Sequence, residues 1–216
     1  RIAILKVKEF WDLLYNKIGT GWGFEPSDSA IAASEIFSVK GYKDVLIPGI
    51  GYGRNISPFS DKGMHVSGIE ISEKAIKLMK ENNLVNDIYE GSVLDMPFSN
   101  AKYDAVFSYA LLHLFDYFER RKIISSCYNQ LTDGGMMIFS VSSADDLKEK
   151  GQLIGRNRYL QSNNMKVFYY DDGSIQKEFS KFELTEIRDI EEPFKFMKNE
   201  PPMKFKFIVC IKSNSY

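Results

Sequence analysis

The 216-residue sequence has only two cysteines and two histidines. Cys127 and Cys210 lie far apart, and neither has a partner at metal-ligand spacing. With His65 and His113 as the only histidines, no Cys/His metal site can be assembled. We therefore expect no metal, two reduced and buried thiols, and a cytoplasmic location.

Long apolar runs and an excess of one charge are absent as well. No apolar run approaches the roughly 20 residues that span a bilayer, and Lys6, Lys8 and Glu9 interrupt the first one, unlike in a signal peptide. The net charge of −1 provides no overall field that would attract nucleic acid or an anionic membrane. We expect neither partner.

What the sequence does have is a turn rich in glycine after a buried strand. Residues 44–48 form a short apolar run typical of a parallel sheet, and Gly49, Gly51 and Gly53 follow it. Glycines allow a sharp turn and the close approach of a ligand to the backbone. This pattern predicts a turn that binds a cofactor.

The next predicted strand, 65–70, ends in Glu70, whose carboxylate is placed to accept the hydroxyl hydrogens of a ribose. A dinucleotide-binding turn has the pattern G-x-G-x-x-G, whereas here Arg54 stands where its third glycine would be. The two features together predict a nucleoside cofactor. A nicotinamide-dependent oxidoreductase remains a less favoured alternative.

Alternating segments predict a doubly wound, mostly parallel seven-stranded sheet, Rossmann-like, with helices on both faces. Helices are expected at 1–18, 28–38, 54–62, 72–83, 117–131 and 172–181, and strands at 44–48, 65–70, 87–90, 103–109, 136–142, 182–192 and 204–212. We expect the helix at 117–131 to stop at Asp133-Gly134-Gly135, and residues 144–166 to be charged and irregular. The last two strands should pair antiparallel because a modest loop joins them.

The length suits a single domain, 1–216. Within it we expect N-terminal helices and a lid in residues 1–40, with Trp22 and Phe24 in the lid. A cofactor-binding core follows in residues 41–142. A cap or excursion, a helix and the closing antiparallel strands follow in residues 143–216.

Four motifs in order across residues 43–142 resemble those of the class I S-adenosylmethionine-dependent methyltransferases. They are the glycine turn with Glu70, the loop Glu90-Gly91-Ser92-Val93-Leu94-Asp95-Met96-Pro97-Phe98, the segments Tyr103-Asp104-Ala105-Val106-Phe107-Ser108 and Leu111-Leu112-His113-Leu114, and the turn Asn129-Gln130-Leu131-Thr132-Asp133-Gly134-Gly135. The resemblance implies S-adenosylmethionine as cofactor, S-adenosylhomocysteine as product, and in-line methyl transfer.

The sequence departs from the family pattern at three positions. Pro48 replaces the usual acidic residue, Ser92 stands where aspartate is common, and Leu112 replaces a histidine. Pro48 is similar to the strand end of thiopurine and halide or thiol methyltransferases, and the turn from Gly51 to Asn55 resembles that of tellurite-resistance methyltransferases. Both resemblances imply a small, polarisable acceptor.

The predicted site follows from these motifs. Candidate catalytic residues are His113, as general base for an acceptor that carries a proton, and Tyr109, in the acceptor pocket. Arg156 and Arg158 either hold an anionic acceptor or form a solvated face. The predicted cofactor-binding residues are Trp22, Gly49, Gly51, Gly53, Arg54, Asn55, Glu70, Ile71, Ser92, Val93, Ser108 and Tyr109.

The leading hypothesis is therefore methyl transfer to a small molecule, with an inert methyltransferase-like binding or regulatory module as the alternative. The acceptor is left open among thiol, halide or metalloid, amine, carboxylate and hydroxyl. The need for a base and the oligomeric state are left open too.

Overall fold

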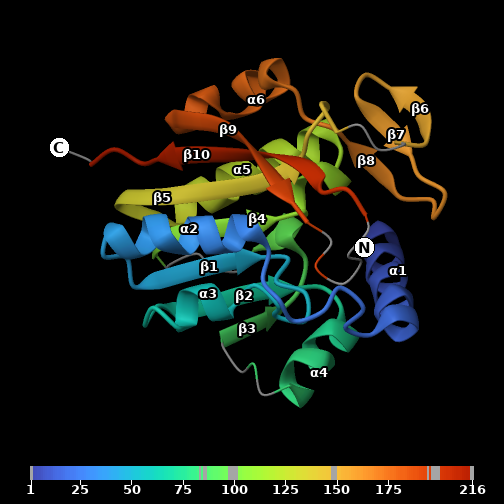
Figure 1. Cartoon of the computed structure of the whole chain (residues 1–216), viewed down its shortest axis with the longest axis horizontal. Coiled ribbons are helices and arrows are strands. Elements are labelled where there is room, and N and C mark those ends of the chain that lie inside the picture. Colours follow the sequence, from blue (N-terminus) through green and yellow to red (C-terminus); the bar gives the residue numbers. More distant parts are fainter. Residues whose placement is uncertain are drawn as a thin grey trace.

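A seven-stranded sheet forms the centre of the protein, with strand order β3-β2-β1-β4-β5-β10-β9 (Figure 1). Neighbouring strands from β3 to β5 pair in parallel, whereas β10 is antiparallel to both β5 and β9. The strand order reverses between β1 and β4, and open α/β sheets bind ligands at such a point, outside the carboxyl ends of the strands. The predicted architecture and its antiparallel finish are confirmed.

The computed structural model describes residues 2–82, 84, 87–96, 102–146, 150–193, 195 and 200–214. The helices are α1 (Ile2–Ile18), α2 (Asp28–Val39), α3 (Ser57–Ser60), α4 (Glu73–Glu81), α5 (Tyr117–Gln130) and α6 (Asp172–Phe179), with short 3₁₀ turns η1 (Val93–Asp95), η2 (Leu112–Leu114) and η3 (Ser180–Phe182). The strands are β1 (Asp44–Pro48), β2 (His65–Glu70), β3 (Asp87–Glu90), β4 (Tyr103–Tyr109), β5 (Leu131–Ser142), β6 (Gln152–Gly155), β7 (Arg158–Leu160), β8 (Lys166–Phe168), β9 (Leu184–Glu192) and β10 (Met203–Ile211).

Both faces of the sheet are buried, and this explains the continuous apolar runs of its central strands. On one face α2 and α3 pack on β1 and β4 through Ala33, Phe37 and Phe59. On the other face α5 and α6 cover the sheet through side chains such as Ile123 and Phe179. This two-sided core holds the carboxyl ends of the strands in fixed positions.

The helix starts follow from capping side chains. Ser27 and Ser72 each accept a hydrogen bond from a backbone N–H three residues later, at the start of α2 and α4. At α5 the side chain of Asp116 caps the first turn, and Glu119 bonds back to the Asp116 N–H. These caps set where the connections from the strand ends enter the helices.

The helix expected at 54–62 is reduced to the four residues of α3, so this prediction is wrong. The glycine turn after β1 continues through Asn55, whose side-chain oxygen accepts the Ser27 N–H. Pro58 then lies in the first turn of α3. Proline is tolerated only there because it has no N–H to donate.

The expected glycine stop after α5 is also wrong. The helix ends at Gln130, and Leu131 is already extended, with φ −73° and ψ 142°. Gly134 and Gly135 belong to β5 and exchange hydrogen bonds with Lys212, the Gly134 N–H donating across 2.9 Å and the Gly135 carbonyl accepting across 2.8 Å. The glycine pair thus lies within a strand, because its hydrogen bonds to a distant partner outweigh the local stop signal.

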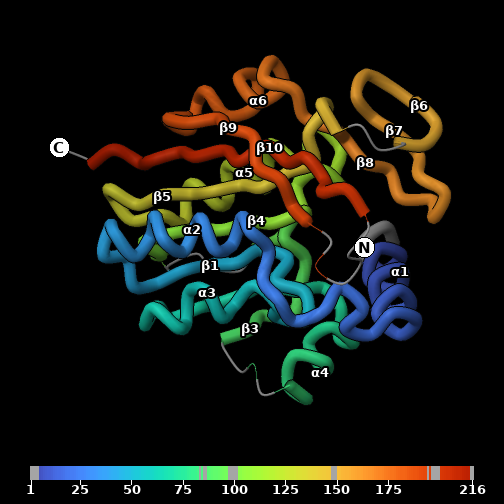
Figure 2. The backbone as a smooth tube through the Cα atoms, viewed as in Figure 1, coloured from blue at the N-terminus to red at the C-terminus, as the bar shows by residue number. Residues whose placement is uncertain are grey.

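Residues 150–168 are not irregular, in contrast to the prediction for 144–166. They form a three-stranded antiparallel sheet, β6-β7-β8. Asn157 and Asn164, at φ +55° and +66°, make its tight connections, and asparagine in such turns was the hairpin signal. Figure 2 places this sheet toward the end of the long axis where α1 also lies, away from the C-terminus.

Candidate active site

The three glycines after β1 all have left-handed backbone conformations, with φ of +67°, +62° and +88° for Gly49, Gly51 and Gly53. A Cβ at Gly49 would lie 2.7 Å from a methyl group of Leu111, and one at Gly53 would lie 2.8 Å from the Ile56 side chain. These two glycines therefore permit internal packing as well as the turn. At Gly51 a Cβ would lie 3.0 Å from the hydroxyl of Tyr15 instead.

Glu70 lies at the end of β2 with its carboxylate turned toward this turn. Its Oε2 accepts the N–H of Gly51 at 2.9 Å and its Oε1 accepts the N–H of Ser72 at 2.9 Å. Burial raises the pKa of Glu70, and these backbone donors oppose that rise. A carboxylate has about four acceptor positions, and the backbone N–H groups of Gly51, Ile71 and Ser72 do not occupy all of them. The carboxylate is thus oriented by the backbone and retains capacity for hydroxyl donors.

Helix α1 covers this part of the crevice. Its Asp12 Oδ1 accepts the Ser72 hydroxyl at 2.6 Å and the Lys74 N–H at 3.1 Å, at the N-terminus of α4. Lys8 adds ion pairs to Asp12 and to Glu73, at 3.2 and 2.8 Å. A carboxylate at a helix N-terminus is favourable because it meets unpaired N–H groups and the positive end of the helix dipole.

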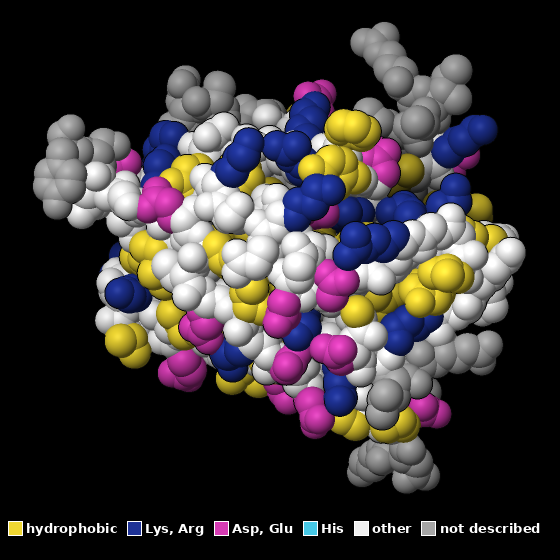
Figure 3. Space-filling model, turned by 90° about the horizontal axis from the view of Figure 1, so that it is seen from above, with side chains coloured by type: hydrophobic (Ala, Val, Ile, Leu, Met, Phe, Trp, Pro, Cys, Tyr) yellow, Lys and Arg dark blue, Asp and Glu magenta, His cyan; other side chains and the backbone are white. Residues whose placement is uncertain are grey.

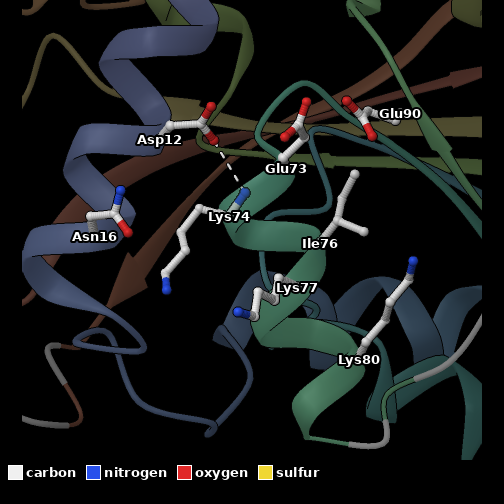
Figure 4. Close-up of a pocket in the computed structure, with 8 residues that line it drawn as sticks. All are labelled: Asp12, Asn16, Glu73, Lys74, Ile76, Lys77, Lys80 and Glu90. Atoms are coloured by element: carbon white, nitrogen blue, oxygen red, sulfur yellow. Dashed lines mark hydrogen bonds between the residues drawn. The ribbon is translucent and has the colours of Figure 1, made fainter.

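A hollow of about 590 Å³ lies beside this contact between α1 and α4 (Figure 4). Asp12 and Asn16 of α1 border it on one side, and Figure 4 shows Glu73 and Glu90 pointing toward one another at its far end. The two carboxylates interact, and repulsion by Glu73, added to burial, raises the pKa of Glu90. Glu70 does not line this hollow, which is open to solvent.

Trp22 and Arg54 connect the loop after α1 to the glycine turn. The Arg54 Nη1 donates to the Trp22 carbonyl at 3.2 Å, and its guanidinium lies 5.5 Å from the ring centre of Tyr109. The Tyr52 hydroxyl donates to the Gly23 carbonyl at 2.6 Å. The structure thus brings the predicted lid residue Trp22 together with the turn and with the end of β4.

The predicted residue Asn55 has another contact. Its Oδ1 accepts the Ser27 N–H at 2.9 Å, and the residue is buried. The side chain therefore holds the start of α2 against the glycine turn.

Three further predicted residues surround the strand ends. Ile71, directly after Glu70, is half-buried, and Val93, the first residue of η1, is buried. The Ser92 hydroxyl accepts the Leu94 N–H at 3.2 Å and so caps η1. Pro97 and Phe98 of the predicted loop lie outside the described residues.

The end of β4 carries Ser108 and Tyr109 on opposite faces of the sheet. The Tyr109 ring stacks on Phe205 with ring centres 5.5 Å apart, and burial together with nearby Glu192 raises the pKa of Tyr109. The buried Ser108 hydroxyl has no hydrogen-bond partner among the described residues. Ala110, directly after β4, has φ +53°, a left-handed conformation that is unusual for alanine.

His113 lies in η2 and is buried. Its Nδ1 accepts the N–H of Ser142 at 3.1 Å, and burial lowers the pKa of His113 to about 3. The ring is therefore neutral at physiological pH and a weak base. This geometry gives His113 a structural role at the junction of η2 and β5.

Arg158 does not point to an open site, because its Nη1 donates to the Phe115 carbonyl at 2.7 Å. Arg156 is exposed. Neither arrangement favours the anion-binding alternative.

Glu192, at the end of β9, is a residue that the sequence pattern did not single out. It is only 1% exposed, and its oxygens accept the N–H groups of Asp28 and Ser29 at 3.0 and 2.8 Å. An acid ending a strand late in the chain carried no local signal, because its partners are more than 160 residues away. Tyr15 and Asp12 were missed as well, because their contacts with Gly51 and Ser72 join separate elements of the chain.

Among the described residues, no group of three His, Cys, Asp or Glu side chains is placed to hold a metal ion. No helix in the described part of the chain is both long and apolar enough to cross a membrane.

The strand order defines a Rossmann-like fold, which solved structures of S-adenosylmethionine-dependent methyltransferases share. Residues 46–139 match a family model described as a methyltransferase domain. The match covers the glycine turn, Glu70, the β4 end and the start of β5.

A curated relative from Mycolicibacterium smegmatis, a probable S-adenosylmethionine-dependent methyltransferase, is 26% identical over 99 residues. These residues make up 45% of this chain and 37% of the relative, so the chain matches little more than a third of the relative's length.

Solved structures share the fold at low identity. One, reported for the conversion of a disulfide bond into a thioacetal group during echinomycin biosynthesis, has a TM-score of 0.70 and 14% identity over 95% of this chain and 93% of that one. A Burkholderia thailandensis 1,6-didemethyltoxoflavin-N1-methyltransferase with bound S-adenosylhomocysteine has a TM-score of 0.65 and 15% identity over 87% of this chain and 79% of that one. TehB from Haemophilus influenzae has a TM-score of 0.61 and 19% identity over 83% of this chain and 60% of that one.

Proposed function

We propose that this chain binds S-adenosylmethionine at the glycine turn and transfers its methyl group to a small-molecule acceptor by in-line displacement. The observation that carries the proposal is the placement of the buried Glu70 carboxylate against the Gly51 N–H, at the carboxyl ends of adjacent strands. The family match over residues 46–139 and the named ligand of the toxoflavin methyltransferase support the choice of cofactor.

The residues present fit this cofactor. Glu70 retains acceptor capacity for ribose hydroxyls, and glycine at 51 permits the left-handed turn whose N–H orients the Glu70 carboxylate. Ile71 and Val93 offer apolar surface, and the Ser92 backbone offers polar groups, at the place for the adenine. Arg54 is a cation at the inner end of the site, suited to the carboxylate of the methionine part. The other predicted cofactor residues remain expectations.

When bound, the cofactor supplies a methyl group on a positively charged sulfur, which is already activated for transfer. The protein then contributes orientation and exclusion of water. Helix α1 and Trp22 cover the crevice, and Tyr109 stacked on Phe205 provides a flat wall for the acceptor.

Among the described residues, the titratable groups on the acceptor side have other contacts. His113 is a weak base, Glu192 bonds the start of α2, and Asp28 pairs with Lys195 at 2.7 Å. We therefore propose an acceptor that needs no enzymatic base, such as a halide or a thiol of low pKa.

We expect no nucleic-acid partner. On the face that Figure 3 shows, Asp and Glu side chains lie among the Lys and Arg side chains, so this face is not uniformly basic. The cytoplasmic location and the domain limits stay predictions.

Calorimetry with S-adenosylmethionine, S-adenosylhomocysteine and NAD tests the cofactor. We expect both adenosyl compounds to bind and NAD not to bind. Glu70→Ala should lower the affinity by roughly 10-fold or more, because a charged hydrogen-bond acceptor is lost. Exposed Glu73, at the start of the next helix, supplies the control Glu73→Gln.

Release of S-adenosylhomocysteine with a panel of thiols, halides, amines, carboxylates and phenols tests the transfer. Turnover with any member supports an enzyme. Cofactor binding without turnover across the panel would favour the inert-module alternative.

A further inference from the structure

The second sheet becomes less buried from its inner strand to its outer strand. In β8 Val167 and Phe168 are 3% and 9% exposed, and Phe168 belongs to the core on one face of the main sheet. The residues of β7 are half-buried, and all four residues of β6 are exposed. β6 and β7 thus form a hairpin that projects from a fixed base, at the periphery of the molecule in Figure 1.

The projecting strand β6 exposes two large aliphatic side chains. Leu153 is 61% exposed and Ile154 is 42% exposed, and the two are direct neighbours in sequence. Scattered single apolar residues are ordinary on a protein surface, whereas adjacent ones at a projecting edge are typical of a surface that contacts a partner. The hairpin therefore offers apolar area that the fold itself does not bury.

The same small sheet is basic. Residues 150–168 contain Lys150, Arg156, Arg158 and Lys166 and no acidic residue. Arg156, in the turn between β6 and β7, and Lys166 of β8 are both exposed. The net charge of the whole chain, −1, therefore hides a local excess of positive charge on this sheet.

Acidic residues of neighbouring elements offset only part of this charge. Asp171 interacts electrostatically with Arg156, and Asp116 and Glu119 interact with Arg158. Asp116 and Asp171 are the caps of α5 and α6, so their oxygens also accept backbone N–H groups there. Basic and aliphatic side chains thus dominate the outer part of the small sheet.

The edge of β6 is poorly suited to pairing with a further strand. Its register with β7 shifts between Leu153 and Gly155, which leaves Ile154 without a partner residue. Such an irregular edge disfavours the addition of a strand from a peptide or from a second copy of the chain. Single-stranded nucleic acid is bound by aromatic stacking, which aliphatic side chains do not provide.

A lipid surface suits both components of this surface. We propose that Leu153, Ile154, Arg156 and Lys166, which we call the hairpin surface, bind the headgroup region of an anionic lipid bilayer. Basic side chains are attracted to anionic lipids, and aliphatic side chains gain free energy at the boundary between headgroups and acyl chains. Shallow insertion leaves the edge backbone groups of β6 in the wet headgroup layer, where water satisfies them.

The hairpin surface is joined to the end of the main sheet that carries the candidate site. Tyr170, two residues after β8, forms a parallel bridge with Ser143, which directly follows the carboxyl end of β5. A protein bound through the hairpin surface therefore holds the carboxyl ends of its strands near the lipid.

Co-sedimentation of the full chain with phosphatidylcholine vesicles, with and without about one third phosphatidylserine, tests the proposal. We expect binding to the anionic vesicles and at least about tenfold weaker binding to the neutral ones. Salt at about 1 M should weaken binding to the anionic vesicles, because the Debye length falls to about 3 Å.

Substitutions separate the two components of the surface. Arg156→Gln and Lys166→Gln should each weaken binding to the anionic vesicles about fivefold. Leu153→Ser combined with Ile154→Ser should weaken it at least about tenfold, because the apolar contribution is lost.

Val39→Ser and Lys40→Gln are the matched controls, at the end of α2. Val39 is 86% exposed and Lys40 is exposed as well, so they offer the same residue types outside the hairpin surface. Both should bind the vesicles as the wild-type protein does. Because every substituted side chain is exposed or partly exposed, circular dichroism should show the native fold for each variant.

Equal binding to neutral and anionic vesicles, or no binding to either, would overturn the proposal. Unchanged binding after the paired serine substitutions would do the same, because the strand would then not enter the lipid. An RNA oligonucleotide that displaces the protein from the vesicles would assign the surface to nucleic acid instead. The measurement needs neither cofactor nor acceptor, so its failure leaves the proposed function untouched.

Discussion

The Glu70 carboxylate and the Gly51 N–H lie 2.9 Å apart, although 19 residues separate them in sequence. The bond joins the end of β2 to the turn after β1, so the acid and the glycine turn form one unit. Tyr15 lies above the same glycine. A substitution at any of these three residues should therefore weaken binding of the cofactor more than binding of the acceptor.

Gly51→Ala tests the close approach at the turn. The added methyl group would lie 3.0 Å from the Tyr15 hydroxyl at a φ of +62°, so the hydroxyl must shift by a few tenths of an ångström. We expect a loss of about 1–2 kcal/mol in stability from the left-handed backbone and, in addition, weaker binding of S-adenosylmethionine. Gly63→Ala is the control: its φ is +76°, but nothing lies within 4 Å, so it should cost stability without changing affinity.

Glu178→Gln tests the buried ion pair that joins α5 to α6. Arg120 donates to both oxygens of Glu178 at 3.0 and 2.6 Å, and the Tyr170 hydroxyl donates to the same carboxylate. Removing one charge leaves the other buried, and we expect a loss of about 3 kcal/mol in urea unfolding.

Glu186→Gln is the control for that experiment. Its partner Arg188 is 40% exposed, and the loss should stay below about 0.5 kcal/mol. Equal losses in the two variants would contradict the importance of burial.

His113→Asn tests the buried neutral imidazole. The folded pKa of about 3 lies below the ordinary value of about 6.5, so the unfolded chain binds this proton first as pH falls. The His113 contribution should thus reduce the free energy of unfolding by about 2 kcal/mol between pH 7 and pH 5. The asparagine variant, whose amide oxygen can still accept the Ser142 N–H, should lack this part of the pH dependence.

The same variant bears on the chemistry. If the acceptor needs no enzymatic base, His113→Asn should keep the shape of the pH–rate profile. If the variant lost the rise of rate with pH that the wild-type protein shows, His113 would act as a base after all.

Asp12→Ala tests how α1 is held. Loss of the bonds to Ser72 and Lys74 should release α1 locally, and amide hydrogen exchange in its peptides should be about tenfold faster. Lys17→Ala, at an exposed position on the same helix, should leave exchange unchanged. Unchanged exchange in Asp12→Ala would show that the aromatic contacts alone hold the helix.

The residues that could be predicted from the sequence are those whose reason is local. Glycine at 49, 51 and 53 follows from the backbone conformation there, and Glu70 follows from ending the second strand. Asn55 was assigned to the cofactor because its turn resembles that of tellurite-resistance methyltransferases, and its observed partner is Ser27, 28 residues earlier. A short sequence motif does not reveal a hydrogen-bond partner in another part of the chain.

The sequence by itself determined the sheet, because alternating apolar runs and helical periods depend on near neighbours. It also determined the cofactor turn, because its backbone geometry demands glycine. Only the tertiary structure decided that Gly134 and Gly135 lie within β5, that residues 150–168 form a second sheet, and that Tyr15 of α1 lies over Gly51. Each of these depends on partners far along the chain, whose contacts outweigh the local preference.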